Sequence, residues 1–189
     1  MVVAAVVAFT AHNVIAADIA RPEVEARLDL ADLGAPISAP FLTWLGQRVG
    51  AAPGVLDCVL VRYGTGGSAG WAAGPDHLAL VPRPDLAAHP RAARARRLRA
   101  GVAIYADPDA RGLVMLGRGL AGRREVSFEV ASEHRGAGLG RRLVAAALTL
   151  LPANEPVFAQ ASPGNAASLR ALLAAGFRPI GSEVLFVRS

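Results

Sequence analysis

The spacing of apolar and polar residues separates an N-terminal part, residues 1–63, from the rest of the chain. Residues 1–20 carry two valine-rich apolar blocks, which predict a pair of buried strands. Residues 22–29 form a short helix candidate with proline in its first turn, and Ser38 opens a second helix that ends at a glycine. The apolar block at 55–63 predicts a further strand. We therefore expect an α/β extension at the N-terminus.

A glycine-rich segment, residues 64–76, follows this extension and is the expected boundary between two domains. The pattern beyond it predicts an arginine-rich helix and then the order β-β-β-α-β-α-β. The predicted elements are a helix at 85–101, strands at 102–106, 113–120 and 125–130, a helix at 138–151, a strand at 156–160, a helix at 165–176 and a strand at 182–187. We expect residues 77–189 to form an α/β domain, with a mixed central sheet and helices on both faces.

Composition adds a preference for acidic ligands. Of the 189 residues, 53% are hydrophobic and 19% are charged, which excludes a disordered chain. The formal net charge is +5, and because the chain has no lysine, arginine supplies all 20 of its Lys and Arg positions. This charge suits phosphate-bearing or acidic ligands, although a GC-rich coding bias explains the arginine usage equally well.

The arginines of the predicted helix at 85–101 are spread around its circumference. They are Arg91, Arg94, Arg96, Arg97 and Arg99. This distribution is typical of a solvated helix that packs through its alanines. Because no aromatic residues lie between the arginines for bases to stack on, we do not expect nucleic acid as a partner.

The first 20 residues also resemble the apolar part of a secretory signal. They lack its positively charged start, and His12 and Asn13 interrupt the apolar run well short of a membrane span. The single cysteine, Cys58, excludes an internal disulfide and is compatible with a reducing compartment. We therefore expect a cytoplasmic protein without a membrane partner, and a secretory signal is the alternative.

The segment EHRGAGLGRRLV, residues 133–144, places glycines at alternate positions just before a predicted helix. A P-loop needs a lysine, which this chain lacks. A dinucleotide-binding turn needs G-x-G-x-x-G and an acidic residue at the end of the next strand, where this chain has Gln160. The segment does satisfy the pattern R-x-x-G-x-G, through Arg135, Gly138 and Gly140. Glycines admit a ligand to the backbone, and the N–H groups of a helix N-terminus attract anions, so an anion is the expected ligand.

In this segment the sequence resembles the GCN5-related N-acetyltransferases, in which it forms the pyrophosphate loop for acetyl-CoA between the fourth strand and the third helix. Two further pairs of residues follow at the family's spacing, Asn165 with Ser168 and Gly176 with Phe177. The resemblance covers roughly residues 77–187. A glycine turn and an ordinary helix end would explain each match by itself, but not all of them in this order.

The resemblance implies acetyl-CoA as acyl-donor substrate and no metal ion. In the family, the backbone of the fourth strand binds the pantetheine arm and the thioester carbonyl, here near Val130 or Ala131. The residues expected to bind the coenzyme are Val130, Ala131, Arg135, Gly136, Ala137, Gly138, Leu139, Gly140, Arg141, Asn165 and Ser168.

The resemblance also implies a general base on the predicted strand at 125–130, often a glutamate in this family. Glu125, Ser127 and Glu129 share one face of that strand because side chains alternate. We prefer Glu129 as the catalytic residue, since it is nearer the pantetheine end, with Glu125 as the second candidate. The alternative is that both carboxylates simply face solvent.

The chain departs from the family at two positions. Many relatives carry a tyrosine, the general acid for the coenzyme thiolate, where this chain has Leu172. Water, or a hydroxyl such as that of Ser162 or Tyr105, is the candidate replacement. Ser132 stands where the family usually has a proline. These departures concern catalysis and not coenzyme binding.

No motif identifies the acceptor. Trp71 and His77 could line an acceptor pocket, or they could pack or lie exposed in the glycine-rich loop. We expect His134, next to the phosphate loop, to face solvent. Residues 1–63 could cover the acceptor site or form a dimer surface, so a second copy of the chain is a candidate partner.

We expect an enzyme, an acetyl-CoA-dependent N-acetyltransferase that acts on a primary amine of a small molecule or peptide. The amine would attack the thioester directly in a ternary complex, because a thioester is already activated. The alternative is a catalytically degenerate acyl-CoA-binding sensor or interaction module, which the missing tyrosine motivates.

Overall fold

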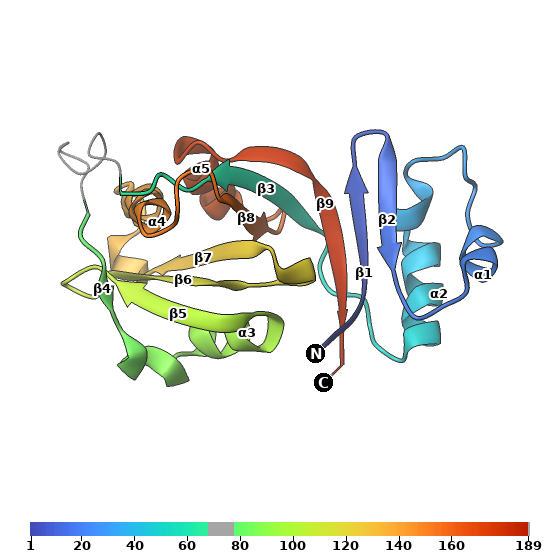
Figure 1. Ribbon diagram of the computed structural model, residues 1–189, viewed down its shortest axis with the longest axis horizontal. Coiled ribbons are helices and arrows are strands. Elements are labelled where there is room, and N and C mark those ends of the chain that lie inside the picture. Colours follow the sequence, from blue (N-terminus) through green and yellow to red (C-terminus); the bar gives the residue numbers. More distant parts are fainter. Residues whose placement is uncertain (68–77, 189) are drawn as a thin grey trace. The chain divides into compact units, whose positions relative to one another are not determined.

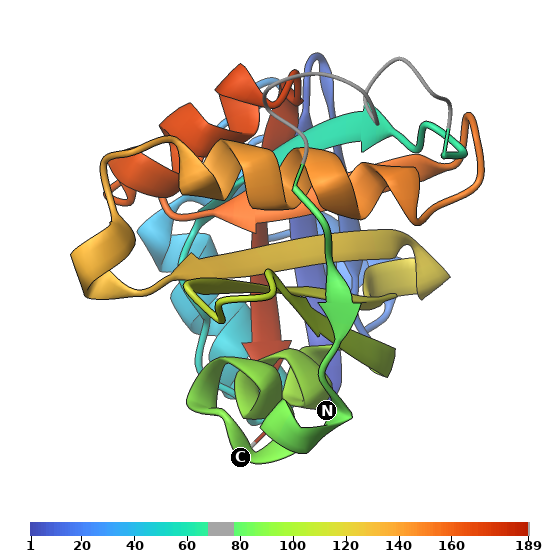
Figure 2. The same ribbon diagram turned by 90° about the vertical axis from the view of Figure 1, so that its left-hand side faces the viewer.

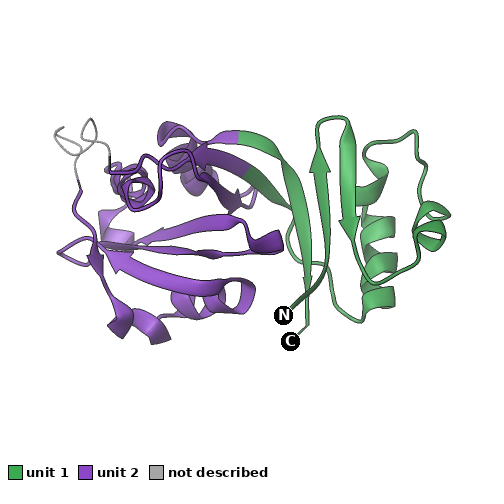
Figure 3. Ribbon diagram, viewed as in Figure 1, with its two compact units in different colours: residues 1–59, 179–189 green, residues 60–178 purple. Residues whose placement is uncertain are grey.

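The computed structural model describes residues 1–67 and 78–188, and the chain divides into two compact units (Figure 3). Unit 1 combines Met1–Val59 with Pro179–Ser189, and unit 2 is Leu60–Arg178. These boundaries differ from the predicted segments, because the last strand of the chain belongs with the N-terminal residues. Most of the predicted glycine-rich loop, with Trp71 and His77, lies outside the described residues.

Unit 1 contains three antiparallel strands and two α-helices (Figure 1). These are β1 (Val2–Phe9), β2 (His12–Ala16), α1 (Arg21–Glu25), α2 (Ala39–Val49) and β9 (Arg178–Val187), with a 3₁₀ turn at Ala35–Ile37. β1 lies in the middle and pairs with β2 on one side and β9 on the other. The two strands expected in residues 1–20 are present, but only β1 is buried, because residues of β2 alternate between exposed and half-buried. The first helix ends at Glu25 and is shorter than expected.

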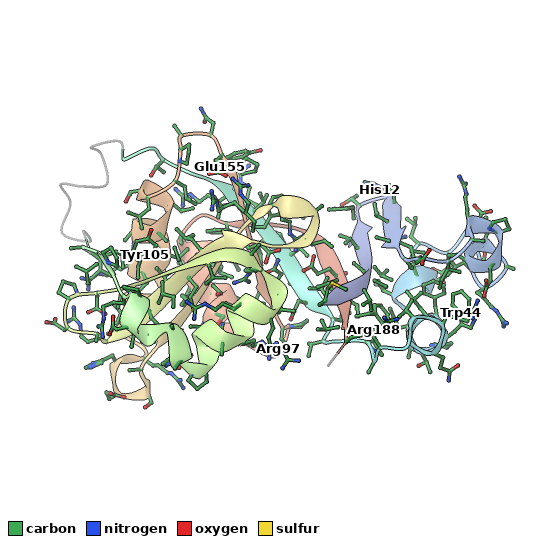
Figure 4. All side chains as sticks on the ribbon, turned by 60° about the horizontal axis from the view of Figure 1, so that its bottom comes forward. His12, Trp44, Arg97, Tyr105, Glu155 and Arg188 are labelled. Atoms are coloured by element: carbon green, nitrogen blue, oxygen red, sulfur yellow. The ribbon has the colours of Figure 1, made fainter. Side chains whose placement is uncertain are left out.

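The core of unit 1 forms where α2 packs on the strands. Leu45 of α2 and Val6 of β1 are fully buried there together with Phe186 of β9. Trp44, labelled in Figure 4, packs against Phe41 at the border of this core, with the two rings tilted by 39°. The helix ends at Gly50, which adopts a left-handed conformation (φ +65°) as the predicted glycine stop requires.

The described residues of unit 2 form a mixed sheet and three α-helices. Its strands are β3 (Asp57–Tyr63, from Leu60 on), β4 (Val81–Pro82), β5 (Ala100–Ala106), β6 (Gly112–Arg118), β7 (Arg124–Val130) and β8 (Pro156–Ala161), and its α-helices are α3 (Pro90–Leu98), α4 (Leu139–Thr149) and α5 (Ala166–Ala174). Short 3₁₀ turns occupy Pro84–Ala88, Leu120–Gly122 and Ser132–His134. The strand order is β3-β8-β7-β6-β5-β4.

The three strands β5, β6 and β7 form the predicted antiparallel meander, and β8 is parallel to β7. In Figure 2, α4 and α5 lie on one face of this sheet and α3 lies on the other. The α3 side contains a small core in which Ala92 and Ala95 pack with Met115. The prediction of a mixed sheet with helices on both faces is therefore confirmed.

Most arginines of α3 are exposed. Arg94, Arg96 and Arg97 lie at the surface, while Ala92 and Ala95 pack against the sheet. Figure 4 shows Arg97 extending away from the helix into solvent. In the part of the chain that the structure describes, no helix combines the length and the apolar character that crossing a membrane requires.

Candidate active site

The two parallel strands in the middle of unit 2 separate after a short contact. Among the described residues, β7 pairs with β8 only at Arg124 and Glu125, opposite Val157 and Phe158. On its other side β7 stays paired with β6 along its whole length. The second half of β7 therefore has one edge without a neighbouring strand, and its backbone groups there can bind a ligand.

The N-terminus of α4 lies beside this free edge, and the glycine segment shapes it. Gly138 is the N-cap residue of α4 with φ +75°, and Gly136 has φ +84°. Residues other than glycine rarely adopt such positive φ angles. A Cβ at either position would meet no atom within 4 Å. The first N–H groups of a helix lack intrahelical partners and carry the positive end of the helix dipole. The loop is thus open towards solvent and suited to an anion.

Gly140 has a different role from the other two glycines. A Cβ at this position would lie 2.9 Å from Cε2 of the Phe128 ring and 3.4 Å from Cβ of Ala171. Glycine therefore lets the first turn of α4 pack closely on β7 and α5. This close packing brings the amide groups of the helix N-terminus next to the end of β7.

A cleft of about 750 Å³ runs along these elements. Its lining residues are Arg91, Phe128, Glu129, Val130, His134, Arg135, Gly136, Gly138, Leu139, Gly140, Arg141, Asn165, Ala167, Ser168, Arg170, Ala171 and Ala174. Nine of the eleven residues predicted to bind the coenzyme are among them, and the two others, Ala131 and Ala137, are not. The fold thus gathers residues from three separate segments around one open space.

The cleft is electropositive. Arg91, Arg135, Arg141 and Arg170 line it, and Glu129 is the one carboxylate among its described lining residues. Arg135 has a structural contact as well, because its Nε donates a hydrogen bond to the Val130 carbonyl oxygen at 3.1 Å. That bond ties the phosphate loop to the end of β7.

The structure separates the two glutamates predicted as candidate bases. Glu129 lines the cleft at the free half of β7. Glu125 lies where β7 still pairs with β8 and is only 4% exposed. Its carboxylate accepts from Nε of Arg99 at 2.6 Å and from Nε of Arg123 at 2.8 Å. A carboxylate held by two arginines is a poor proton acceptor, which favours Glu129 as the base.

Arg99 was not expected to be buried. Its side chain is 8% exposed, and besides Glu125 it donates to Ser127 Oγ at 2.7 Å and to Gln160 Oε1 at 3.1 Å. Arg99 therefore joins β7 to β8 at the level where their backbone pairing has stopped. Its position just after the last residue of α3, directly before β5, is the sequence feature that sets it apart from the exposed arginines.

The Glu125 carboxylate is expected to stabilise the fold in a pH-dependent way. Burial alone would raise the pKa of Glu125, but the charges of Arg99 and Arg123 and their hydrogen bonds hold this pKa below its ordinary value. A lowered pKa means that the carboxylate stabilises the fold above the unfolded-state pKa, and that this contribution is lost as pH falls through the folded-state pKa.

We expect Glu125→Gln to lower the free energy of unfolding by about 3–5 kcal/mol at neutral pH, because it removes the carboxylate charge that two largely buried guanidinium groups share. Urea unfolding followed at several pH values measures this, and the difference from wild type should shrink in acid. The exposed Glu133 provides the control, since Glu133→Gln should change stability by less than about 1 kcal/mol. Equal losses in the two variants would contradict the prediction.

Residues 78–177 match the sequence model of a family described as the acetyltransferase (GNAT) family. This match spans more than half of the chain. The chain belongs to the GNAT acetyltransferase family.

A solved structure has a similar fold, and a second one was also matched. An acetyltransferase from the GNAT family from Colwellia psychrerythraea is 10% identical, with a TM-score of 0.50, and the alignment covers 94% of this chain and 76% of that one. A GCN5-related N-acetyltransferase from Kribbella flavida is 14% identical, with a TM-score of 0.48 and coverage of 79% and 65%. No curated protein shows a significant sequence match.

In this GNAT protein the position of the usual tyrosine is closed off from the cleft. Leu172 on α5 is 2% exposed and belongs to the core. The two hydroxyls considered as substitutes, those of Tyr105 and Ser162, are not among the described cleft-lining residues. His134 is exposed and does line the cleft.

Asn165 of the GNAT motif acts as the N-cap of α5. Its Oδ1 accepts a hydrogen bond from the Ser168 backbone N–H at 3.1 Å. We expect Asn165→Ala to lower the free energy of unfolding by about 0.5–2 kcal/mol and Asn165→Ser to lower it less, because serine can still cap the helix. Thermal unfolding measures both. If the two variants were equally unstable, the cap would not be the source of the effect.

Proposed function

We propose that the protein is an acetyl-CoA-dependent N-acetyltransferase that acts on a primary amine of a small molecule or peptide. The observation that carries this proposal is the single cleft that joins the free edge of β7, the open N-terminus of α4 and the Glu129 carboxylate. Membership in the GNAT family supports an acyl transfer, and the choice of acetyl group and amine is our inference.

The phosphate loop would hold the coenzyme by its pyrophosphate. Backbone N–H groups after Gly136 and Gly138 would donate to the phosphates, and Arg141, which also lines the cleft, would add positive charge beside them. The pantetheine arm would then extend along the unpaired edge of β7, where backbone groups near Val130 are available to it. Loop and strand together would bring the thioester to Glu129.

The chemical step requires a neutral amine. Glu129 would accept a proton from the substrate ammonium, directly or through a water molecule. The nitrogen lone pair then attacks the thioester carbonyl carbon, and a backbone N–H near the end of β7 would stabilise the negative charge on the oxygen. As the tetrahedral intermediate collapses, the C–N bond remains and the C–S bond breaks, with its electron pair leaving on sulfur, and the nitrogen releases its surplus proton to water. Water would in turn protonate the thiolate, because the leucine side chain at position 172 has no proton to donate.

The experiment is to incubate the protein with acetyl-CoA and a library of amines while the free thiol is measured. Thiol release that depends on both substrates, with the acetylated amine identified by mass spectrometry, supports the proposal. The buried Leu172 favours one alternative, a sensor that binds acyl-CoA without turnover. Binding of acetyl-CoA by calorimetry without thiol release across the library would support the sensor. Absence of any coenzyme binding would overturn both.

A further inference from the structure

Arg91 lines the cleft but is not among the residues predicted to bind the coenzyme. It lies in the first turn of α3, and its backbone N–H donates to His89 Nδ1 at 3.2 Å, which fixes the start of the helix. The side chain is half-buried and lines the same cleft as Glu129. Arg91 therefore approaches the cleft from the α3 side of the sheet, opposite to α4 and α5 (Figure 2).

The surroundings of Arg91 do little to stabilise its charge. Loss of solvent lowers the pKa of Arg91, the Arg94 and Arg99 charges lower it further, and only the Glu129 charge acts in the other direction. A cation in the first turn also faces the positive end of the helix dipole. None of the ion pairs found among the described residues includes Arg91. Its charge is thus available to an anion in the cleft.

The other cleft arginines are placed for a different task. Arg135 and Arg141 flank the phosphate loop, and Arg170 lies on α5, so all three come from the side of the sheet where the coenzyme phosphates would lie. Arg91 instead shares its end of the cleft with Glu129, the residue proposed to take up the amine proton. An anion held by Arg91 would lie beside the reacting carbonyl and not beside the pyrophosphate.

We propose that Arg91 binds a carboxylate of one of the two substrates next to the reacting centre. Guanidinium and carboxylate match in geometry and charge, and the pair forms two parallel hydrogen bonds. The carboxylate has two possible sources: the α-carboxylate of an amino-acid acceptor, or the distal carboxylate of a dicarboxylic acyl group on the donor. This inference rests on the proposed function of the same cleft.

The test compares matched substrates in wild type, Arg91→Gln, Arg91→Lys and the control Arg94→Gln, which removes an exposed arginine of the same helix. One pair of acceptors is an amino acid and its carboxamide with acetyl-CoA as donor. One pair of donors is succinyl-CoA and butyryl-CoA with a neutral amine as acceptor. For each pair, the measured quantity is the ratio of kcat/KM for the charged substrate to that for the uncharged one.

We expect wild type to prefer the charged member of one pair, and Arg91→Gln to lower that ratio about 10- to 100-fold, as expected for a lost charged hydrogen bond. Arg91→Lys should retain part of the preference, and Arg94→Gln all of it. The pair that responds identifies the source of the carboxylate. If wild type shows no preference in either pair, the proposal is overturned. It is also overturned if Arg91→Gln lowers kcat/KM equally for the charged and the uncharged substrate, because Arg91 would then act only through Glu129.

Binding measurements keep this test separate from the test of acyl transfer. Calorimetric Kd ratios for succinyl-CoA against butyryl-CoA, and for the amino acid against its carboxamide in the presence of CoA, require no turnover. A ratio that depends on Arg91 in a protein without transferase activity would support the carboxylate site and overturn the proposed function. Acetyl transfer to neutral amines, together with Kd ratios near one, would support the proposed function and overturn the carboxylate site.

Discussion

Replacement of Gly138 by tryptophan is expected to weaken acetyl-CoA binding by about 100-fold or more, which corresponds to the loss of one or two charge-assisted hydrogen bonds to backbone amides. The reason is local geometry. Gly138 has φ +75°, it caps α4, it lines the cleft, and a Cβ at this position would meet no atom within 4 Å. An indole there would occupy the position of the pyrophosphate. Isothermal calorimetry measures the change in Kd.

Gly122 offers a matched control for this substitution. It has φ +74°, it also has open space around the position of a Cβ, and it lies in the 3₁₀ turn before β7 and not among the described cleft-lining residues. Gly122→Trp therefore introduces the same backbone strain, about 1–3 kcal/mol, without entering the cleft. It should bind acetyl-CoA as wild type does. If both variants lost binding equally, strain would be the cause and the loop would not be the phosphate site.

The second large effect is expected at Glu129. Glu129→Gln keeps the shape of the side chain but cannot accept a proton, so kcat should fall about 10²- to 10⁴-fold, the usual contribution of a general base. The Kd for acetyl-CoA should stay close to that of wild type, because the glutamate would act on the amine. Steady-state kinetics with the identified amine and calorimetry with acetyl-CoA measure the two quantities.

Glu133→Gln serves as the control for charge near the phosphate loop. Glu133 is exposed, accepts a hydrogen bond from Ser132 Oγ at 2.9 Å, and is not among the described cleft-lining residues. Its replacement should leave kcat unchanged. A Glu129→Gln variant with full activity would show that water alone deprotonates the amine and would remove Glu129 from the proposed mechanism.

Local pattern was sufficient for the elements around the cleft. The alternation of apolar and polar residues placed β7 correctly, and the glycines before an apolar stripe placed the start of α4 within about one residue. The resemblance to the GNAT family then predicted that Asn165 and Ser168 share a site with Arg135. The spacing of these residues along the chain does not predict this by itself. The structure brings these residues together around one cleft.

Contacts between distant segments were not predictable in the same way. Alternation put Glu125 and Glu129 on one face, but which one is buried depends on Arg99, 26 residues away, and on Gly119, where any side chain would collide with the Glu125 carboxyl. The segment predicted as a helix at 85–101 likewise shows five similar arginines, and only the tertiary structure places Arg99 against Glu125 and Arg91 in the cleft.

The pairing of β1 with β9 has a consequence for how the chain is made. Val6 lies opposite Val184, so unit 1 needs residues from both ends of the sequence. Contacts at such a separation form slowly, because a long loop must be closed first. During synthesis, residues 60–178 can fold into unit 2 as they leave the ribosome, before β9 is available to pair with β1. Unit 1, most of whose residues are translated before those of unit 2, is therefore the last to be completed.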